Sequence, residues 1–145
     1  MIGGFLALGN GGSSGGGGLA PRDVTNLNVA SGDGQLVLSW KDPADTVVDG
    51  KTICAWDGTI VVQKEGSAPT SEKDGTVILN TTTRDYYETR GFTVNNLQND
   101  HEYYFGVFPY STTGAYNTGE NNRIRGTPKA HLIFGVRRLI NARLL

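Results

Sequence analysis

The stretch Leu-Gln-Asn-Asp-His-Glu-Tyr-Tyr-Phe-Gly-Val-Phe-Pro-Tyr, residues Leu97–Tyr110, predicts a tight turn that leads into a buried strand. In an extended chain, alternate side chains point to opposite sides. Tyr103, Phe105 and Val107 therefore share one face. The apolar character of that face indicates that it packs into a hydrophobic core.

The turn before this strand has the spacing of a tyrosine corner. Leu97 precedes Tyr103 by six residues, and Asn99 and Asp100 lie between them. In such a corner the tyrosine hydroxyl bonds to backbone upstream of its own strand. A strand that merely follows an Asn/Asp turn is the alternative interpretation. We expect Leu97 and Tyr103 to define the fold.

Trp40 is the third residue that we expect to define the fold. In the alternating segment of residues 35–40, Trp40 lies on the same face as Leu36 and Leu38. Because this face is apolar, we predict a core position for Trp40. A sugar-stacking role for this ring is the alternative.

Turn-forming residues recur through the middle of the chain, and helical periodicity is nearly absent there, so we predict an all-β domain. Its size is that of a β-sandwich. Seven short strands can be placed, at about residues 21–29, 35–40, 59–64, 77–79, 92–94, 103–110 and 122–126.

The two ends of the chain differ from this domain, which we place at residues 21–127. Residues 1–20 combine an apolar peptide, Met1–Leu8, with a Gly/Ser-rich tether, and a disordered terminus is the alternative interpretation. Residues 128–145 form a basic tail, whose end is compatible with a short amphipathic helix or a strand. We therefore expect a sandwich with extended N- and C-terminal arms.

Charge is divided unevenly along the chain, although its formal net charge is only −1. Every acidic residue lies between Asp23 and Glu120, whereas the charged residues beyond Glu120 are all basic. This division predicts an interaction tail that meets an acidic surface, such as the body of a neighbouring copy. Nucleic acid is a less favoured partner, because the tail lacks the interleaved aromatic residues of single-strand binders.

The sequence offers little to a catalytic or metal-based function. Cys54 is the only cysteine, and the only histidines, His101 and His131, lie outside any recognisable catalytic motif. The aspartates of residues 42–57 do not follow an EF-hand pattern, although adventitious calcium there is an alternative. We expect no enzymatic activity, no cofactor, no metal site and no membrane span. The absence of a recognisable secretory signal predicts synthesis in a cytoplasm.

Three aromatic residues near strand ends are candidate ligand contacts. Trp56 lies near the end of a long connection, Lys41–Gly58, and beside Asp57, as a carbohydrate-stacking ring would. A ring packed over the edge of the core is the alternative interpretation. Tyr110 and Tyr116 flank the loop after the last buried strand.

Residues from about Pro21 to Thr127 resemble a fibronectin type III domain. The resemblance is carried by Pro21 and Leu27, by Leu36–Trp40 with Asp42-Pro43 after it, and by Leu97–Val107. It covers about three quarters of the chain and implies a seven-stranded β-sandwich without disulfides. The long insertion between Trp40 and Thr59 departs from the common pattern.

A narrower resemblance is to fibronectin-like modules in bacteriophage virion proteins. It is carried by the amino-acid sequences of Trp40–Gly50, Lys64–Thr70 and Tyr103–Tyr110. Gly126–Ala130 is in addition similar to a junction between modules. It implies a virion structural protein of the tail, tail fibre or baseplate, made in the host cytoplasm. A head or neck decoration protein and a carbohydrate-binding adhesion module are the alternatives.

On this interpretation the partners are other virion proteins, further copies of the chain and, as an option, a host surface glycan. The arms would supply the anchoring side chains, which are Ile2, Phe5, Leu6, Leu8, Phe134, Arg137, Arg138 and Arg143.

Overall fold

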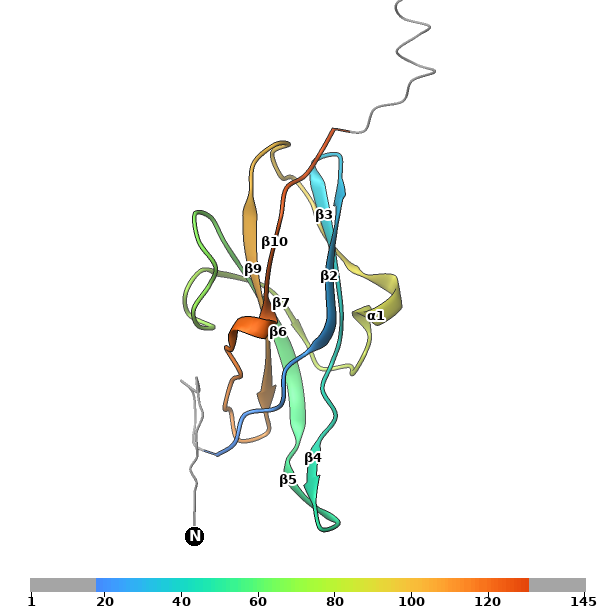
Figure 1. The fold of residues 1–145 in the computed structure, drawn as a ribbon, viewed down its shortest axis with the longest axis vertical. Coiled ribbons are helices and arrows are strands. Elements are labelled where there is room, and N and C mark those ends of the chain that lie inside the picture. The colour runs from blue at the N-terminus through green and yellow to red at the C-terminus, as the bar shows by residue number, and fades with distance from the viewer. Residues whose placement is uncertain (1–17, 131–145) are drawn as a thin grey trace, which may run out of the picture.

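Nine strands form within residues 18–130, the part of the chain that the computed structural model describes (Figure 1). They are β2 (Thr25–Gly32), β3 (Gln35–Lys41), β4 (Thr46–Val48), β5 (Lys51–Cys54), β6 (Trp56–Lys64), β7 (Thr76–Thr81), β8 (Phe92–Val94), β9 (Tyr103–Ser111) and β10 (Arg123–Gly126). A one-turn helix, α1 (Tyr87–Arg90), precedes β8, and a 3-10 turn, η1 (Glu120–Asn122), precedes β10.

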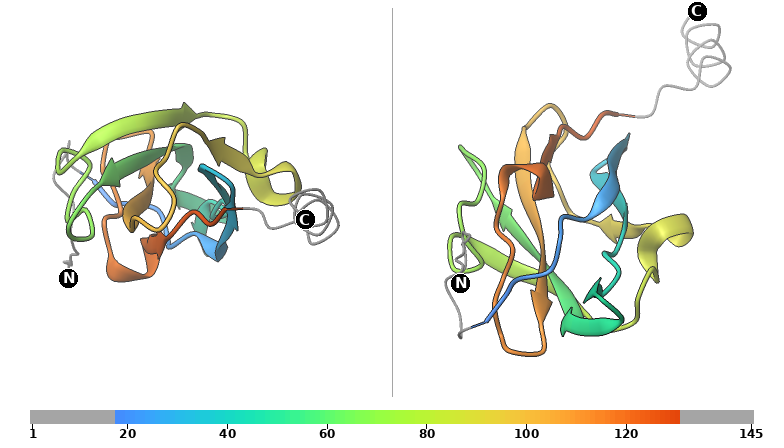
Figure 2. Two further views of the ribbon diagram at one scale, coloured as in Figure 1. Left: turned by 90° about the horizontal axis from the view of Figure 1, so that it is seen from above. Right: turned by 60° about the horizontal axis from the view of Figure 1, so that its bottom comes forward.

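Two antiparallel sheets face each other, as a fibronectin-like sandwich requires (Figure 2). One has the strand order β10-β9-β6-β7, and the other has the order β2-β3-β8. These seven strands correspond to the seven expected from the sequence. The all-β class is therefore confirmed.

The prediction of exactly seven strands is wrong, because a third sheet forms where a long loop was expected. Strands β4 and β5 pair as a hairpin, with Val48 opposite Lys51 and only Asp49 and Gly50 between them. Both turn residues have positive φ, 51° and 75°, as a tight type I′ hairpin turn requires. Asp and Gly tolerate this conformation, so the Asp-Gly pair closes the hairpin locally.

The main core lies between the two large sheets. Trp40 is 1% exposed, and Phe105 and Val107 are fully buried. Tyr103 is buried in the same cluster, which confirms the predicted inner face of β9. The ring of Tyr87 in α1 lies 5.4 Å from that of Trp40, so the short helix packs against the end of β3 that extends beyond β8.

The tyrosine corner is present. The backbone N–H of Gln98 donates to the hydroxyl of Tyr103 at 2.9 Å, and Leu97 packs against the core. The corner also contacts the β2–β3 turn, since the N–H of Leu97 donates to the carbonyl of Gly34. These bonds connect the two sheets at one end of the sandwich.

At the other end, buried Asp42 connects three segments. Its Oδ1 accepts hydrogen bonds from Trp40 Nε1 at 2.9 Å and from Thr59 Oγ1 at 2.7 Å. Its Oδ2 accepts one from the N–H of Asp85, whose own carboxylate accepts the N–H of Asp42. A buried carboxylate needs such compensation, because its desolvation otherwise costs several kcal/mol. Strands β3 and β6 and the segment before α1 are thereby held together.

The four-stranded sheet is also covered on its outer face. Ile60, Val62 and Phe108 point away from the main core and are nevertheless buried. Gly75, at the end of the 65–75 loop, lies against Val62. Pro69 in that loop is fully buried, so the loop contributes a second apolar layer.

The described chain begins and ends at opposite ends of the sandwich (Figures 1 and 2). Gly18 lies against Thr113, near the β4–β5 hairpin. Lys129 lies at the other end, where its N–H donates to the carbonyl of Gly32 in the β2–β3 turn. The expected arms themselves, residues 1–17 and 131–145, lie outside the described residues.

Replacing Asp42 by alanine should destabilise the sandwich strongly. Trp40 Nε1, Thr59 Oγ1 and the N–H of Asp85 would lose their acceptor inside the protein, which we expect to cost roughly 3 kcal/mol of unfolding free energy. Urea unfolding followed by tryptophan fluorescence measures this. Asp57→Ala, at an exposed carboxylate, is the matched control and should change stability by less than about 0.5 kcal/mol. An equal effect of the two substitutions would contradict the role given to Asp42.

The carboxyl group of Asp74 should make the unfolding free energy depend on pH in the acidic range. Hydrogen bonds from Lys64 Nζ and from the N–H and hydroxyl of Thr70 lower the pKa of the Asp74 carboxyl from 3.8 to about 2. As the pH falls, this carboxyl group is therefore protonated in the unfolded chain before it is protonated in the folded chain. Its contribution to stability is present above pH 3.8 and is lost between pH 3.8 and about 2. Asp74→Asn should make unfolding free energy fall less steeply across this window, as measured by denaturant unfolding at a series of pH values. An unchanged slope would disprove the contribution.

Candidate functional site

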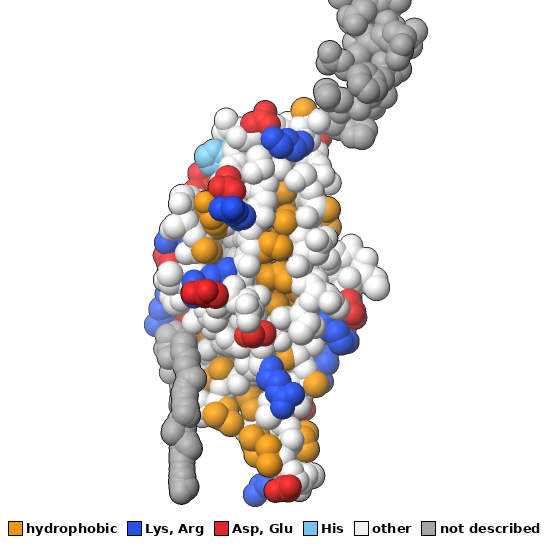
Figure 3. All heavy atoms as spheres, in the orientation of Figure 1, with side chains coloured by type: hydrophobic (Ala, Val, Ile, Leu, Met, Phe, Trp, Pro, Cys, Tyr) orange, Lys and Arg blue, Asp and Glu red, His pale blue; other side chains and the backbone are white. Residues whose placement is uncertain are grey.

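Exposed apolar side chains gather at the hairpin end of the sandwich. Within residues 18–130, Leu19, Val47, Val48 and Ile53 are each between 45% and 51% exposed. Figure 3 shows hydrophobic side chains at this lower end of the molecule, where Figure 1 draws β4 and β5. We call these four residues the hairpin patch.

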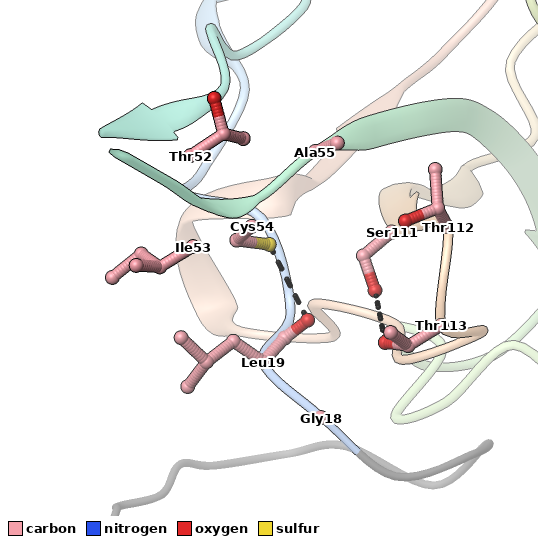
Figure 4. A pocket seen from close by; sticks show the side chains of 9 residues that line it. All are labelled: Gly18, Leu19, Thr52, Ile53, Cys54, Ala55, Ser111, Thr112 and Thr113. Atoms are coloured by element: carbon pink, nitrogen blue, oxygen red, sulfur yellow. Dashed lines mark hydrogen bonds between the residues drawn. The ribbon is translucent and has the colours of Figure 1, made fainter. Parts of the chain in front are cut away.

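A shallow pocket of about 300 Å³ opens beside the hairpin patch (Figure 4). Thr52, Ile53, Cys54 and Ala55 form one wall, at the end of β5. Ser111, Thr112 and Thr113 form the facing wall, and Gly18 and Leu19 cross between the two. The pocket thus lies where the N-terminal part of the chain joins the sandwich.

Cys54 holds the N-terminal segment in this pocket. Its thiol donates a hydrogen bond to the carbonyl of Leu19 at 3.3 Å, and the side chain is only 6% exposed. Burial, with a smaller contribution from the charge of Asp45, raises the pKa of the thiol. The thiol is therefore protonated near neutral pH, as a hydrogen-bond donor must be.

A second set of contacts holds residues 21–24 on the sandwich. The side-chain amide of Asn117 donates both to the carbonyl of Pro21 and to Asp23. The N–H of Val24 donates to Oδ1 of fully buried Asn122 at 2.9 Å. Leu19 and the pocket therefore have a defined position relative to β9 and β10.

The base of the hairpin is held by Arg84. Its guanidinium bonds to Asp45 at 2.6 Å and to the carbonyl of Pro43. The same group lies 5.0 Å from the centre of the Trp56 ring. Asp45 also accepts the N–H of Trp56, so the first strand of the hairpin is joined to the start of β6.

Trp56, a candidate ligand contact, already has protein partners. Its indole N–H donates to Thr59 Oγ1 at 2.9 Å, and Arg84 lies over its ring. The ring is half-buried at the edge of the sandwich. A sugar that stacked on the covered face would have to displace Arg84.

Tyr110 and Tyr116 lie together on the outer face of the four-stranded sheet. Their rings are 5.2 Å apart and pack against Ile60, Val62 and Phe108. The side chain of Tyr110 passes over Gly58. Its hydroxyl donates a hydrogen bond to Asn80 on β7, at 2.8 Å. Burial raises the pKa of both phenols, so both are neutral at physiological pH.

The structure therefore brings two of the three candidate aromatic residues together and leaves the third apart. Trp56 bonds to Thr59, which faces Asp42 between the sheets, whereas Tyr110 lies on the opposite face of β6. The candidate anchoring residues Ile2, Phe5, Leu6, Leu8, Phe134, Arg137, Arg138 and Arg143 all lie outside the described residues.

The hairpin patch was missed by sequence reasoning, although a signal for it exists. Asp49-Gly50 is flanked by Val47-Val48 and Thr52-Ile53, and an Asp-Gly pair between such residues is a strong hairpin signal. Leu19 has no comparable signal. Its position depends on the contacts of Cys54 and Asn117 with distant parts of the chain.

Potential metal ligands do not cluster in the described residues. Within residues 18–130 no group of three or more His, Cys, Asp or Glu side chains could hold a metal ion. His101 Nε2 lies 2.8 Å from Glu65 Oε1, and its ring contacts Tyr103. In the same part of the chain, no helix has the length and hydropathy needed to cross a membrane.

No protein-family model and no curated protein sequence matches the chain. Among solved structures, the fibronectin type III domain of human fibronectin type III domain containing protein 3 is similar, with a TM-score of 0.53, 21% identity, and coverage of 79% of this chain and 92% of that domain. A chain described as "Myokine structure" matches with a TM-score of 0.44 and 19% identity, over 75% and 99% of the two chains. The strand order and the first of these similarities together show a fibronectin type III-like fold.

Proposed function

We propose that this chain is a bacteriophage virion structural protein that is anchored to the particle by its terminal arms and displays the sandwich. The tail, a tail fibre or the baseplate is the favoured location. A head or neck decoration protein would use the same architecture and is the alternative location.

The observation that carries the proposal is the separation of the two chain ends. The described chain begins beside the β4–β5 hairpin and ends beside the β2–β3 turn, at opposite ends of the sandwich (Figure 1). An apolar peptide precedes one end and a basic segment follows the other. A domain built in this way can hold two unlike attachment segments apart.

The ion pairs at the C-terminal end of the domain support the proposal that the arginines further along the chain contact another subunit. Arg125 lies 3.5 Å from Glu102, and Lys129 lies 3.1 Å from Asp100, so the first basic residues pair with the domain itself. These pairs are exposed and contribute little to stability. Arg137, Arg138 and Arg143 would be left to meet an acidic surface on another subunit.

The virion context rests on the resemblance of Trp40–Gly50, Lys64–Thr70 and Tyr103–Tyr110 to phage virion modules. The first of these stretches supplies Trp40 and Asp42, the first strand and turn of the hairpin, and two residues of the hairpin patch. The second leads into the loop that covers the outer face of the four-stranded sheet. The resemblance to phage virion modules thus includes surface features, the hairpin and the loop, in addition to core positions.

Charge reversal in the tail should remove the chain from the assembled particle. We expect Arg137→Glu with Arg138→Glu to lower the copy number in purified particles by about tenfold or more, because two attractive contacts become repulsive. Quantitative immunoblotting of particles measures this. Lys51→Glu with Lys73→Glu makes the same charge change at exposed positions of the sandwich and should have no effect. Absence of the wild-type chain from particles would refute the proposed function.

A carbohydrate-binding adhesion module is the second candidate, and the Tyr110–Tyr116 pair favours it. Both rings are only partly buried, and they lie beside the polar side chain of Asn80. Aromatic rings next to hydrogen-bonding groups are a suitable surface for a sugar. The Arg84 contact makes Trp56 a less favourable member of such a site.

If the module binds host glycans, Tyr116→Ala in the full chain should weaken that binding by roughly tenfold, through the loss of one stacking ring. Binding to host cells and to a panel of their surface glycans measures this. Tyr86→Ala removes a ring that is 41% exposed at a distant position beside α1 and is the matched control. No glycan binding by the unmodified chain would eliminate this candidate.

A further inference from the structure

The hairpin patch exposes apolar surface at the point where the N-terminal segment joins the sandwich. Leu19 and Ile53 both line the pocket at this point and are both close to half exposed (Figure 4). Val47 and Val48 are also exposed on the other strand of the same hairpin and, as neighbours in a strand, point to its two opposite faces. Exposed apolar side chains that gather at one place, as Leu19 and Ile53 do, often mark a contact with a partner.

The hairpin also offers backbone groups for pairing. Strands β4 and β5 form a sheet of only two strands, so each has one edge without a neighbouring strand in the described residues. Such an edge accepts a further extended segment by main-chain hydrogen bonds. The four residues of β5 span roughly 13 Å, a length that four extended residues can match.

The segment that precedes Gly18 has the composition and the reach to occupy this surface. In an extended Met1–Leu8 peptide, Leu6 and Leu8 share one face. The Gly/Ser-rich tether of residues 9–17 has a root-mean-square reach of roughly 17 Å. Because Gly18 itself lines the pocket, the tether holds the peptide near the patch at an effective concentration on the order of millimolar.

We propose that the Met1–Leu8 peptide folds back onto its own molecule, adds a short strand to the free edge of β5, and covers Leu19, Ile53 and the pocket mouth with Leu6 and Leu8. The tether favours the peptide of the same molecule over that of another copy in dilute solution. The same peptide belongs to the arm that we propose anchors the chain to the particle, so this inference concerns the isolated chain before assembly.

Cys54 provides a specific probe of the docked peptide. It is the only cysteine of the sequence, and it lines the pocket that the peptide would close. Modification of its thiol by a maleimide therefore reports access to this one place. If the peptide is docked in about nine molecules of ten, removal of docking should accelerate modification by about tenfold.

The experiment compares modification rates of Cys54 in full-length variants. Leu6→Ser with Leu8→Ser should accelerate modification by about tenfold, whereas the control pair Leu139→Ser with Ile140→Ser, in the other terminal segment, should not. Ile53→Thr should also accelerate modification. Val77→Thr, at a side chain that is 52% exposed on β7, is its control.

A double-mutant cycle separates loss of docking from loosening of the hairpin. If docking is real, Ile53→Thr should add little once Leu6 and Leu8 have been replaced, because both changes remove one interaction. Equal acceleration by Ile53→Thr in both backgrounds would overturn the inference, and so would an unchanged rate in the Leu6/Leu8 variant.

Protein concentration distinguishes the two possible sources of the peptide. The wild-type rate should stay constant across a roughly hundredfold range of protein concentration, since docking within one molecule does not depend on it. A rate that falls with increasing concentration, together with dimers in light scattering, would assign the peptide to another copy and overturn the same-molecule arrangement.

Discussion

The buried carboxylate of Asp42 is the interaction on which the arrangement of the sandwich most depends. It accepts hydrogen bonds from Trp40 in one sheet, from Thr59 in the other, and from the backbone of Asp85. A charge in the interior destabilises the fold unless such donors surround it. The network therefore holds the three segments in this relative placement.

The same region explains why the insertion after Trp40 is ordered. Arg84 directly precedes Asp85 and bonds to Asp45, and the indole of Trp56 packs beneath its guanidinium. The base of the hairpin is therefore linked to the Asp42 network in two ways. Arg84 directly precedes Asp85, and the indole of Trp56 donates to Thr59, which bonds to Asp42. A rigid base lets β4 and β5 project from the sandwich and present apolar side chains to water. An exposed apolar patch on a fixed support is suited to recognition, because little order has to be gained on binding.

The two ends of the sandwich differ in their chemistry. The end that carries the β2–β3 turn is polar, with the exposed ion pair of Lys129 and Asp100 and a hydrogen bond between His101 and Glu65. The end that carries the hairpin has exposed Leu19 and Ile53 at a pocket and exposed Val47 on the neighbouring strand. The outer face of the four-stranded sheet is a third surface, on which the 65–75 loop leaves Tyr110 and Tyr116 partly uncovered. These three surfaces are thus spatially separated.

The sequence by itself determined the all-β class, the inner face of β9, the core position of Trp40 and the corner made by Leu97 and Tyr103. These features depend on alternation and on short spacings, which act within one strand or one turn. The Asp49-Gly50 hairpin was equally local, and the prediction of a loop there overlooked its turn signal. Only the tertiary structure decided the partners of Asp42, the pairing of Arg84 with Asp45 and Trp56, and the gathering of Leu19 with Ile53. Apart from the short-range bond between Trp40 and Asp42, these contacts join residues far apart in the chain, and such contacts follow from packing of the whole domain.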